Sequence, residues 1–319
     1  MSIGSSLPSF DHEAGDLEHP KIERLIIYPV KSCRGISLSD SIVLDEGLEN
    51  DRRWMIVDSH GVFLTQRECP EMARIVPSLL RNAAGVTELH LQLANAQGQW
   101  DPTAPEQRVE SSLENPLRKV LIWKFESQAV DCGHLASKFL SDFLQRPVRL
   151  VRFSDSETRL CNKAWTGELT GRTYFSDGYP ILVLGQASLT DLAVRMNLHG
   201  LEAERFRPNI VISGLPAYQE DYVHTLRLID QDENKPHPAA SPNSMPLALR
   251  LVKPCPRCPI PQVDPWSGHV ALFDPAAELA TYRYHEAAEG AVFGMNSMAY
   301  QGQGQKIAVG QRFEAIYDF

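Results

Sequence analysis

Apolar positions along the chain fall mostly into short runs that alternate with polar residues or are bounded by turn-forming ones. Such runs occupy residues 22–28, 40–44, 55–58 and 89–93. They are rich in Ile, Val and Leu, and Gly, Pro, Asp or Ser residues lie between them, which is typical of strands joined by turns. Short strands at this spacing predict an antiparallel β-barrel or sandwich.

Helical periodicity is confined to a few segments. An apolar stripe predicts a helix over 135–144, and Ser188 with Asp191 resembles a capping box that opens a helix over 189–196. A proline in the first turn predicts a third helix over 275–288. Further strands are expected at 120–124, 148–153, 181–184, 210–214, 307–309 and 312–316. The pattern therefore predicts an α+β fold that is mainly β.

The length of 319 residues exceeds what one ordinary hydrophobic core supports and suits two domains. A polar, weakly periodic stretch at 154–172 places the expected boundary, which gives domains at 21–155 and 156–319. Residues 1–20 are polar and acidic, and we expect a disordered tail there. Residues 230–246 contain four prolines and little apolar character, so they are expected to form an exposed excursion.

Charge and cysteine content narrow the classes of function. The formal net charge of −9 argues against a general nucleic-acid-binding protein, which normally has a basic excess. No run approaches the roughly 20 apolar residues that span a bilayer, and the first 20 residues lack the features of a secretory signal. The six cysteines are scattered, as in proteins of a reducing compartment. We therefore expect a soluble cytoplasmic protein with no nucleic-acid or membrane partner.

The most unusual stretch is 253–261, in which Cys255 and Cys258 flank Arg257 among four prolines. Because proline fixes φ and has no backbone N–H, this stretch is predicted to be a stiff loop that follows a strand. Arg257 is expected to favour the thiolate form of Cys258, the form that binds metals. The pair alone is also compatible with half of a zinc site, a redox pair or two buried thiols.

Cations recur in loops at the ends of predicted strands, and two of these loops carry a further hydrogen-bonding side chain. Arg and Lys suit phosphate groups, and a thiolate suits a transition metal. If the loops converge, they form one site for a multiply anionic ligand held through sulfur. The residues concerned are Lys31, Ser32, Arg52, Arg207, Asn209 and Arg257.

Several segments together resemble the MOSC-domain proteins, specifically the two-part group of amidoxime-reducing components and bacterial YcbX-like reductases. The resemblance runs from about residue 21 to the C-terminus. It is carried by residues 28–35, 51–54, 63–67, 176–180, 206–214, 253–258, 263–265 and 293–294.

The resemblance implies a β-barrel-like N-terminal MOSC domain and a mixed β-barrel MOSC domain, with the molybdenum cofactor (Mo-molybdopterin) in the cleft between them. It implies that Cys258 ligates molybdenum and is catalytic. Asp177 is a further catalytic candidate, as a proton relay. The implied cofactor-binding residues are Lys31, Ser32, Arg52, Asp177, Gly178, Tyr179, Arg207, Asn209, Arg257 and Asn296.

The implied reaction is the reduction of a small N-hydroxylated compound. The sequence has no ferredoxin-type cysteine cluster and no dinucleotide fingerprint, so electrons are expected from a separate ferredoxin-, cytochrome- or flavin-type protein. The Pro-Ile-Pro run at 259–261 departs from the family pattern and leaves the substrate open. One alternative is a sulfur carrier that handles the cofactor through a Cys258 persulfide, and another is a zinc-stabilised interaction module.

Overall fold

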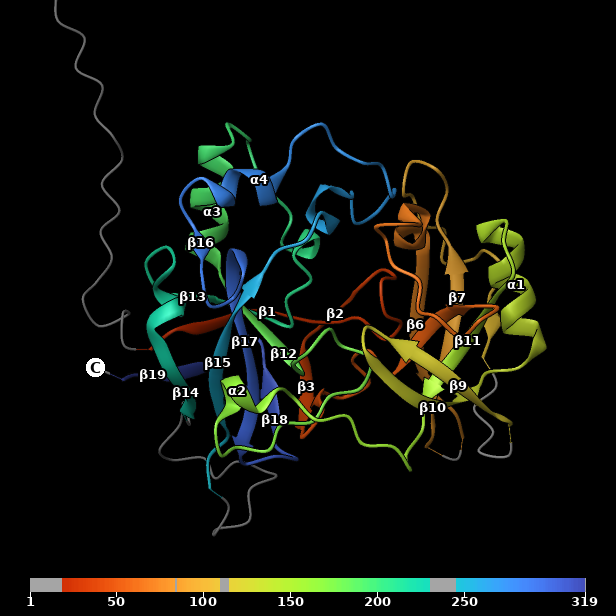
Figure 1. Ribbon diagram of the computed structural model, residues 1–319, viewed down its shortest axis with the longest axis horizontal. Helices are drawn as coiled ribbons and strands as arrows, with labels where there is room; N and C mark the ends of the chain where they lie inside the picture. The colour runs from red at the N-terminus through yellow and green to blue at the C-terminus, as the bar shows by residue number, and fades with distance from the viewer. Residues whose placement is uncertain (1–18, 84, 110–114, 230–244, 319) are drawn as a thin grey trace, which may run out of the picture.

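Seven strands close into a mixed barrel in the computed structural model, which describes residues 19–83, 85–109, 115–229 and 245–318 (Figure 1). The ring order is β12-β13-β1-β19-β14-β15-β17, and it closes because β17 also pairs with β12. The β12–β13 pair is parallel and the remaining pairs of the ring are antiparallel. The ring strands are β1 (Lys21–Ile27), β12 (Ile181–Gly185), β13 (Ile210–Ser213), β14 (Val223–Ile229), β15 (Ala248–Pro256), β17 (Gly290–Gln301) and β19 (Arg312–Tyr317).

A second lobe, to the right in Figure 1, carries a four-stranded sheet β5-β11-β10-β9 and a three-stranded sheet β6-β7-β8. A small sheet β18-β3-β4 lies below the barrel, while β2 pairs with β1 and β16 with β17. Their bounds are β2 (Ile36–Leu38), β3 (Asp40–Leu44), β4 (Gly47–Leu48), β5 (Trp54–Asp58), β6 (Ile75–Arg81), β7 (Thr87–Leu93), β8 (Gln107–Arg108), β9 (Leu117–Ile122), β10 (Phe125–Asp131), β11 (Val148–Phe153), β16 (Tyr284–His285) and β18 (Lys306–Ala308).

Helices are short and lie at the outside of the sheets (Figure 1). The α-helices are α1 (His134–Leu144), α2 (Lys163–Thr166), α3 (Gln186–Arg195) and α4 (Pro275–Ala280). The 3-10 turns are η1 (Pro70–Arg74), η2 (Ala203–Arg205), η3 (Gln219–Tyr222) and η4 (Ile260–Gln262). The prediction of a mainly β, α+β fold is confirmed.

The helix expected over 135–144 is present as α1, although Leu135, at the start of its apolar stripe, is 58% exposed and the neighbouring Ala136 is buried. Two other helix predictions need correction. The capping box is wrong, because α3 begins at Gln186 and the Ser188 hydroxyl donates to the buried Glu220 carboxylate at 2.7 Å. The helix over 275–288 ends at residue 280, because the chain then turns back to pair β16 with β17.

The stretch around the two cysteines is also corrected. It was expected to be a loop, but β15 continues through residues 253–256 and pairs Pro254 with Met295 and Pro256 with Val292 of β17. Proline has no backbone N–H, so it suits a strand edge along which no second strand pairs. Residues 253–256 have such an edge, because β14 pairs with β15 only at residues 248–250. Register shifts on both sides of Pro254 absorb the mismatch.

Two main cores hold the lobes, one inside the barrel and one beneath α1. Strand β1 belongs to the barrel although it precedes the second lobe in sequence. The division between domains at residue 155 stays a prediction. The tail expected at 1–20 lies outside the described residues, except for residues 19 and 20. The excursion expected at 230–246 also lies outside them, except for residues 245 and 246. No helix of the described chain has the length and apolar character to cross a membrane.

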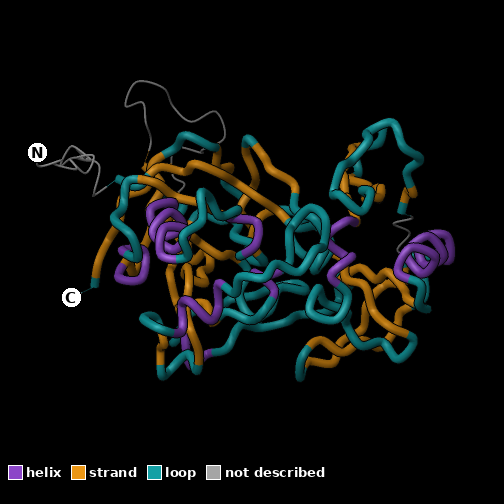
Figure 2. The backbone as a smooth tube through the Cα atoms, turned by 90° about the horizontal axis from the view of Figure 1, so that it is seen from above, coloured by secondary structure: helices purple, strands orange, loops and turns teal. Residues whose placement is uncertain are grey.

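Arg34 ties the two lobes together. Its guanidinium donates to the carbonyl oxygens of Gly98 at 3.1 Å and Trp266 at 2.5 Å, and it stacks on the Trp266 ring at 5.3 Å. Gly98 has a φ of +78°, and a Cβ there would lie 2.7 Å from the Trp266 backbone, so the close approach requires glycine. Viewed from above, the region between the two groups of strands is built largely of loops (Figure 2).

Candidate functional site

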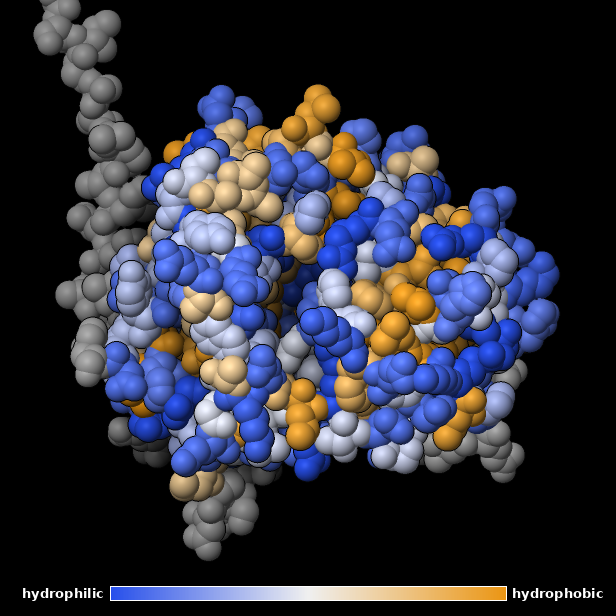
Figure 3. Space-filling view, in the orientation of Figure 1, coloured by the Kyte–Doolittle hydropathy of each residue, from blue (hydrophilic) through white to orange (hydrophobic). Residues whose placement is uncertain are grey.

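A pocket lies where these loops meet, and the space-filling view shows a recess lined by hydrophilic residues between the lobes (Figure 3). The space between its walls, open solvent included, is about 780 Å³. Every candidate named from the sequence lines it: Lys31, Ser32, Arg52, Asp177, Gly178, Tyr179, Arg207, Asn209, Arg257, Cys258 and Asn296. The structure therefore brings together loops that the sequence could only suggest.

Sequence reasoning missed several lining residues: Thr65, Arg67, Ser176, Leu182, Phe206, Cys255, Pro256 and Ile260. Most of them stand within one to three residues of a predicted site residue, so the motif segments as a whole were the available signal. Thr65 and Arg67 had no such neighbour. They reach the pocket because the segment after β5 folds back along it.

The backbone is strained at three of the pocket's residues. Ser32, Arg52 and Arg207 have φ values of 64°, 46° and 57°, a left-handed conformation that side chains other than glycine rarely adopt. Such conformations cost about 1–3 kcal/mol each and cluster at functional sites. Here they turn three polar side chains from different loops toward one space.

Tyr28 supports two of the cations. Its ring is 1% exposed, and the Arg52 and Arg207 guanidinium carbons lie 4.4 and 4.1 Å from its centroid. Burial raises the pKa of the Tyr28 hydroxyl above its ordinary value, although both arginines act in the opposite direction. The neutral ring therefore serves as a platform that keeps two like charges near each other.

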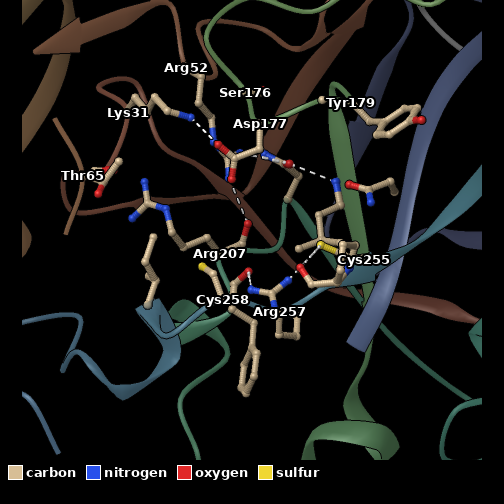
Figure 4. Close-up of a pocket in the computed structure, with 18 of the residues that line it drawn as sticks. Lys31, Arg52, Thr65, Ser176, Asp177, Tyr179, Arg207, Cys255, Arg257 and Cys258 are labelled. Atoms are coloured by element: carbon tan, nitrogen blue, oxygen red, sulfur yellow. Dashed lines mark hydrogen bonds and ion pairs between the residues drawn. The ribbon is translucent and has the colours of Figure 1, made fainter. Parts of the chain in front are cut away.

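Arg52 is neutralised within the protein. Its Nη1 donates to Asp51 Oδ2 at 2.6 Å and to Asn209 Oδ1 at 3.1 Å. Its Nη2 donates to the carbonyl of Arg207, which is labelled beside it in Figure 4, at 3.0 Å. Asp51 is 1% exposed, and burial raises the pKa of its carboxyl against the lowering effect of Arg52. Arg52 is thus both a lining residue and the partner of a buried carboxylate.

Arg207 has no such partner. Its Nη1 donates to the Cys33 carbonyl at 2.8 Å, while its buried Nη2 has no hydrogen-bond partner in the described part of the chain. Burial and the neighbouring Arg52 lower the pKa of Arg207 to about 10, which still leaves the guanidinium charged at neutral pH. A half-buried cation that has no ion pair of its own among the described residues, and whose buried Nη2 is unused, fits a ligand that brings negative charge.

Lys31 and Asp177 form an ion pair at 2.5 Å across the pocket wall (Figure 4). Lys31 is 7% exposed and also donates to the Phe175 carbonyl at 2.9 Å, whereas 68% of the Asp177 side chain is exposed. Burial lowers the pKa of Lys31, and the attraction of Asp177 only partly offsets that effect. The enclosing protein disfavours a charged Asp177, but the charge and hydrogen bond of Lys31 outweigh this and hold its pKa below the usual range. Asp177 is therefore ionised at neutral pH.

Arg159 fixes the loop that presents Asp177. It is 8% exposed, and it donates to the backbone carbonyls of Tyr174 at 3.0 Å, Ser176, and Asp177 at 2.8 Å. Burial lowers the pKa of Arg159, and Asp177 is the nearest charge that opposes this. The backbone of the loop is consequently held in place while the Asp177 carboxylate remains accessible.

The two cysteines differ in their surroundings, while the expectation that Arg257 favours the thiolate of Cys258 stays a prediction. Arg257 Nη1 donates to Cys255 Sγ at 3.0 Å, not to Cys258, and its Nη2 donates to the Phe206 carbonyl at 2.8 Å (Figure 4). Residues two apart in an extended chain point to the same side, which explains why Arg257 reaches Cys255. Cys258 is half-buried, lines the pocket, and its sulfur donates to no group in the described chain.

The donor set can be tested against the molybdenum cofactor that the resemblance implies. Three buried donors at the pocket have no partner among the described residues: Arg207 Nη2, Tyr179 Oη and Arg257 Nε. Unpartnered donors suit the acceptor groups of an anionic, heteroatom-rich ligand, and the Cys258 thiol in the same pocket is the soft ligand that such a metal takes. These residues fit the group. By contrast, no three His, Cys, Asp or Glu side chains of the described chain gather as a metal site, which leaves the zinc module without ligands there.

Sequence comparison assigns the family. The model of the MOSC N-terminal beta barrel domain matches residues 19–147, and the model of the MOSC domain matches residues 170–314. The chain belongs to the MOSC family. The seven-stranded barrel and the pocket are therefore built by a MOSC domain together with the MOSC N-terminal domain, which contributes β1.

Relatives with curated names come from two groups. The chain is similar to mitochondrial amidoxime-reducing component 1 of Mus musculus, 30% identical over 280 residues that cover 86% of this chain and 74% of that protein. The human protein of the same name is 29% identical over 290 residues, covering 87% and 76%. Molybdenum cofactor sulfurase of Oryza sativa subsp. japonica is 30% identical over 278 residues, covering 82% of this chain but 31% of the sulfurase. Both groups support an enzymatic function connected with the molybdenum cofactor.

Proposed function

We propose that this MOSC protein binds the molybdenum cofactor and reduces N-hydroxylated compounds with electrons from a separate donor protein. The observation that carries the proposal is the Arg207 guanidinium, a charged group without a counterion in the described chain, in the same pocket as the free Cys258 thiol. The similarity to amidoxime-reducing components supports the choice of reaction.

In this proposal Arg207, Arg52 and Lys31 bind the anionic and acceptor groups of the cofactor, aided by Ser32 and Asn209. Cys258 supplies the thiolate ligand. The remaining candidates, Gly178, Tyr179, Arg257 and Asn296, line the space where the ring system would lie. When bound, the cofactor supplies two-electron redox chemistry, and the protein supplies binding, orientation and charge.

Reduction of an N–OH group to N–H with release of water consumes two electrons and two protons. Asp177 stays our candidate for the proton relay, but as an ionised carboxylate it can only accept a proton before it passes one on. Lys31 donates a hydrogen bond to Asp177 and lowers the pKa of that carboxyl, so it orients the carboxylate and does not protonate it. We propose that Asp177, whose side chain is 68% exposed, takes up a proton from solvent and passes it to the substrate.

In this proposal the electron donor is a separate protein of the ferredoxin, cytochrome or flavin type. The protein is placed in the cytoplasm, in keeping with cysteines that form no disulfide. The test is the metal and pterin content of freshly purified protein, followed by reduction of benzamidoxime with reduced viologen. Molybdenum near one per chain and turnover are expected. Protein that carries molybdenum and pterin but reduces no N-hydroxylated compound would contradict the reductase assignment.

The alternative is a sulfur carrier that handles the cofactor through a Cys258 persulfide. Two observations favour it: the similarity to molybdenum cofactor sulfurases, and a second pocket thiol, Cys255, held by Arg257 at 3.0 Å. Labile sulfane sulfur on Cys258, with no molybdenum, would support this alternative over the reductase.

A further inference from the structure

The mouth of the pocket contains an aromatic and cationic pair that the proposed function does not use. Arg67 lines the pocket, is exposed, and stacks on the Trp123 ring at 4.7 Å. Its Nε donates to Thr65 Oγ1 at 3.4 Å, and neither of its Nη nitrogens meets a carboxylate or any other acceptor of the described chain. The guanidinium is thus held in orientation by its neighbours while its forked end stays free.

Trp123 is held at the mouth by strain and by contacts from both lobes. It is the first residue of the two-residue turn between β9 and β10, and its φ of 55° is a conformation that hairpin turns usually give to Gly, Asn or Asp. Its ring packs on Phe63 at 5.0 Å, its Nε1 donates to Asp177 Oδ1 at 3.3 Å, and it remains 43% exposed. Arg67 lies over the Trp123 ring and Phe63 packs against it, so the part of the ring that stays exposed offers apolar contact to an aromatic molecule at the mouth.

We propose that Arg67 and Trp123 recognise the substrate, and that the preferred substrate is a planar aromatic compound with an anionic group on the side of the ring opposite its N-hydroxylated centre. This rests on the proposed reductase function and specifies its substrate class. The Arg67 fork matches a carboxylate in two hydrogen bonds, and the exposed part of Trp123 lies beside it for apolar contact with an aromatic ring. Among the other pocket cations, Arg52 pairs with Asp51, Lys31 with Asp177, and Arg257 with Cys255, while Arg207 is assigned to the cofactor.

The test compares benzamidoxime with 4-carboxybenzamidoxime, which differ only in one carboxylate far from the reducible group. Viologen-driven reduction by the cofactor-loaded wild-type protein is expected to give a KM about fivefold lower for the carboxylate, the upper end for an exposed ion pair. The Arg67→Ala variant should bring the two KM values together, and high salt should do the same in the wild type. Trp123→Phe keeps the ring and should keep most of the preference.

Arg195→Ala is the matched control. Arg195 is also an exposed arginine stacked on an aromatic ring, 4.2 Å from the Tyr282 centroid, but it lies on α3 outside the pocket. This variant should retain the wild-type preference.

A second measurement separates failure of this inference from failure of the proposed function. Calorimetric titration with 4-carbamoylbenzoate, which has no N–O bond to reduce, should show binding that weakens about fivefold in Arg67→Ala, whereas benzamide should not discriminate. Equal KM values in the wild type, or a preference that survives Arg67→Ala, overturn the substrate assignment while leaving the reductase in place. If neither amidoxime is reduced, Arg67-dependent binding of 4-carbamoylbenzoate supports the recognition site and its absence overturns it. Loss of turnover only with a protein donor would assign Arg67 to donor docking instead.

Discussion

Replacing Arg207 with alanine should separate ligand binding from stability, because Arg207 is charged and half-buried and forms no ion pair within the described chain. When an arginine that lines a site also pairs with a buried carboxylate, its removal lowers both the affinity for the ligand and the stability of the fold, and the two effects are hard to separate. The main-chain strain at residue 207 is unchanged in Arg207→Ala, since alanine and arginine meet the same restriction at a φ of 57°.

The stability effect follows from opposing contributions. The pKa of Arg207 falls from its ordinary value to about 10, which corresponds to about 3 kcal/mol against the charged form in the folded chain. Alanine removes that penalty, but it also removes the hydrogen bond to the Cys33 carbonyl and the stacking on Tyr28, together about 2–4 kcal/mol. The contributions nearly cancel. We expect the free energy of unfolding without ligand to change by less than about 2 kcal/mol.

Ligand binding should respond strongly, because a charged hydrogen bond contributes about 1.5–3 kcal/mol. Pyrophosphate, as a simple anion, should bind Arg207→Ala about 10- to 100-fold more weakly by calorimetry, and molybdopterin should be lost faster on dialysis. Arg52→Ala is the contrast. It leaves the buried Asp51 carboxylate unpaired and should cost about 3–5 kcal/mol in urea unfolding.

Two results would refute this reasoning. Wild-type affinity for pyrophosphate in Arg207→Ala would mean that the free guanidinium nitrogen does not meet the ligand. A loss of stability as large as that of Arg52→Ala would mean that Arg207 is a structural cation with a counterion other than the ligand.

Three further predictions concern the same pocket. Cys258→Ser should abolish viologen-driven turnover and molybdenum binding while Cys255→Ser retains most activity; equal loss in both would indicate a two-thiolate site. The pure chain should not oxidise NADH in the presence of an N-hydroxylated substrate but should turn over with reduced viologen, and direct NADH-driven turnover would rule out a separate donor. Lys31 lowers the pKa of Asp177, so this pair stabilises the folded chain above the ordinary pKa of aspartate and loses that effect as the pH falls toward the lowered value. Asp177→Asn should therefore unfold more readily than the wild type at pH 7, with a difference that shrinks toward pH 3, and a constant difference would contradict the ion pair.

The sequence by itself determined most strand positions and the residues of the candidate site. Local alternation and turn residues suffice for runs such as 22–28 and 148–153, because each needs only an apolar face and a bounding turn. It did not reveal β10, β14 or β17, in which Gly, Ser, Thr or Asn residues interrupt the apolar pattern. Gly294, in the middle of β17, has a φ of +74° where a Cβ would meet the Val183 carbonyl, a requirement set by the neighbouring strand.

Only the tertiary structure decided how the site's charges are shared. Arg52 and Arg207 read alike in sequence, as arginines in loops before strands, yet one meets a buried carboxylate and the other meets none. Likewise Arg257 adjoins Cys258 in sequence but contacts Cys255 in space. The physical reason is that electrostatic pairing falls off over a few ångströms and depends on which way each side chain points, and both are set by strand pairing between residues that are far apart in the chain.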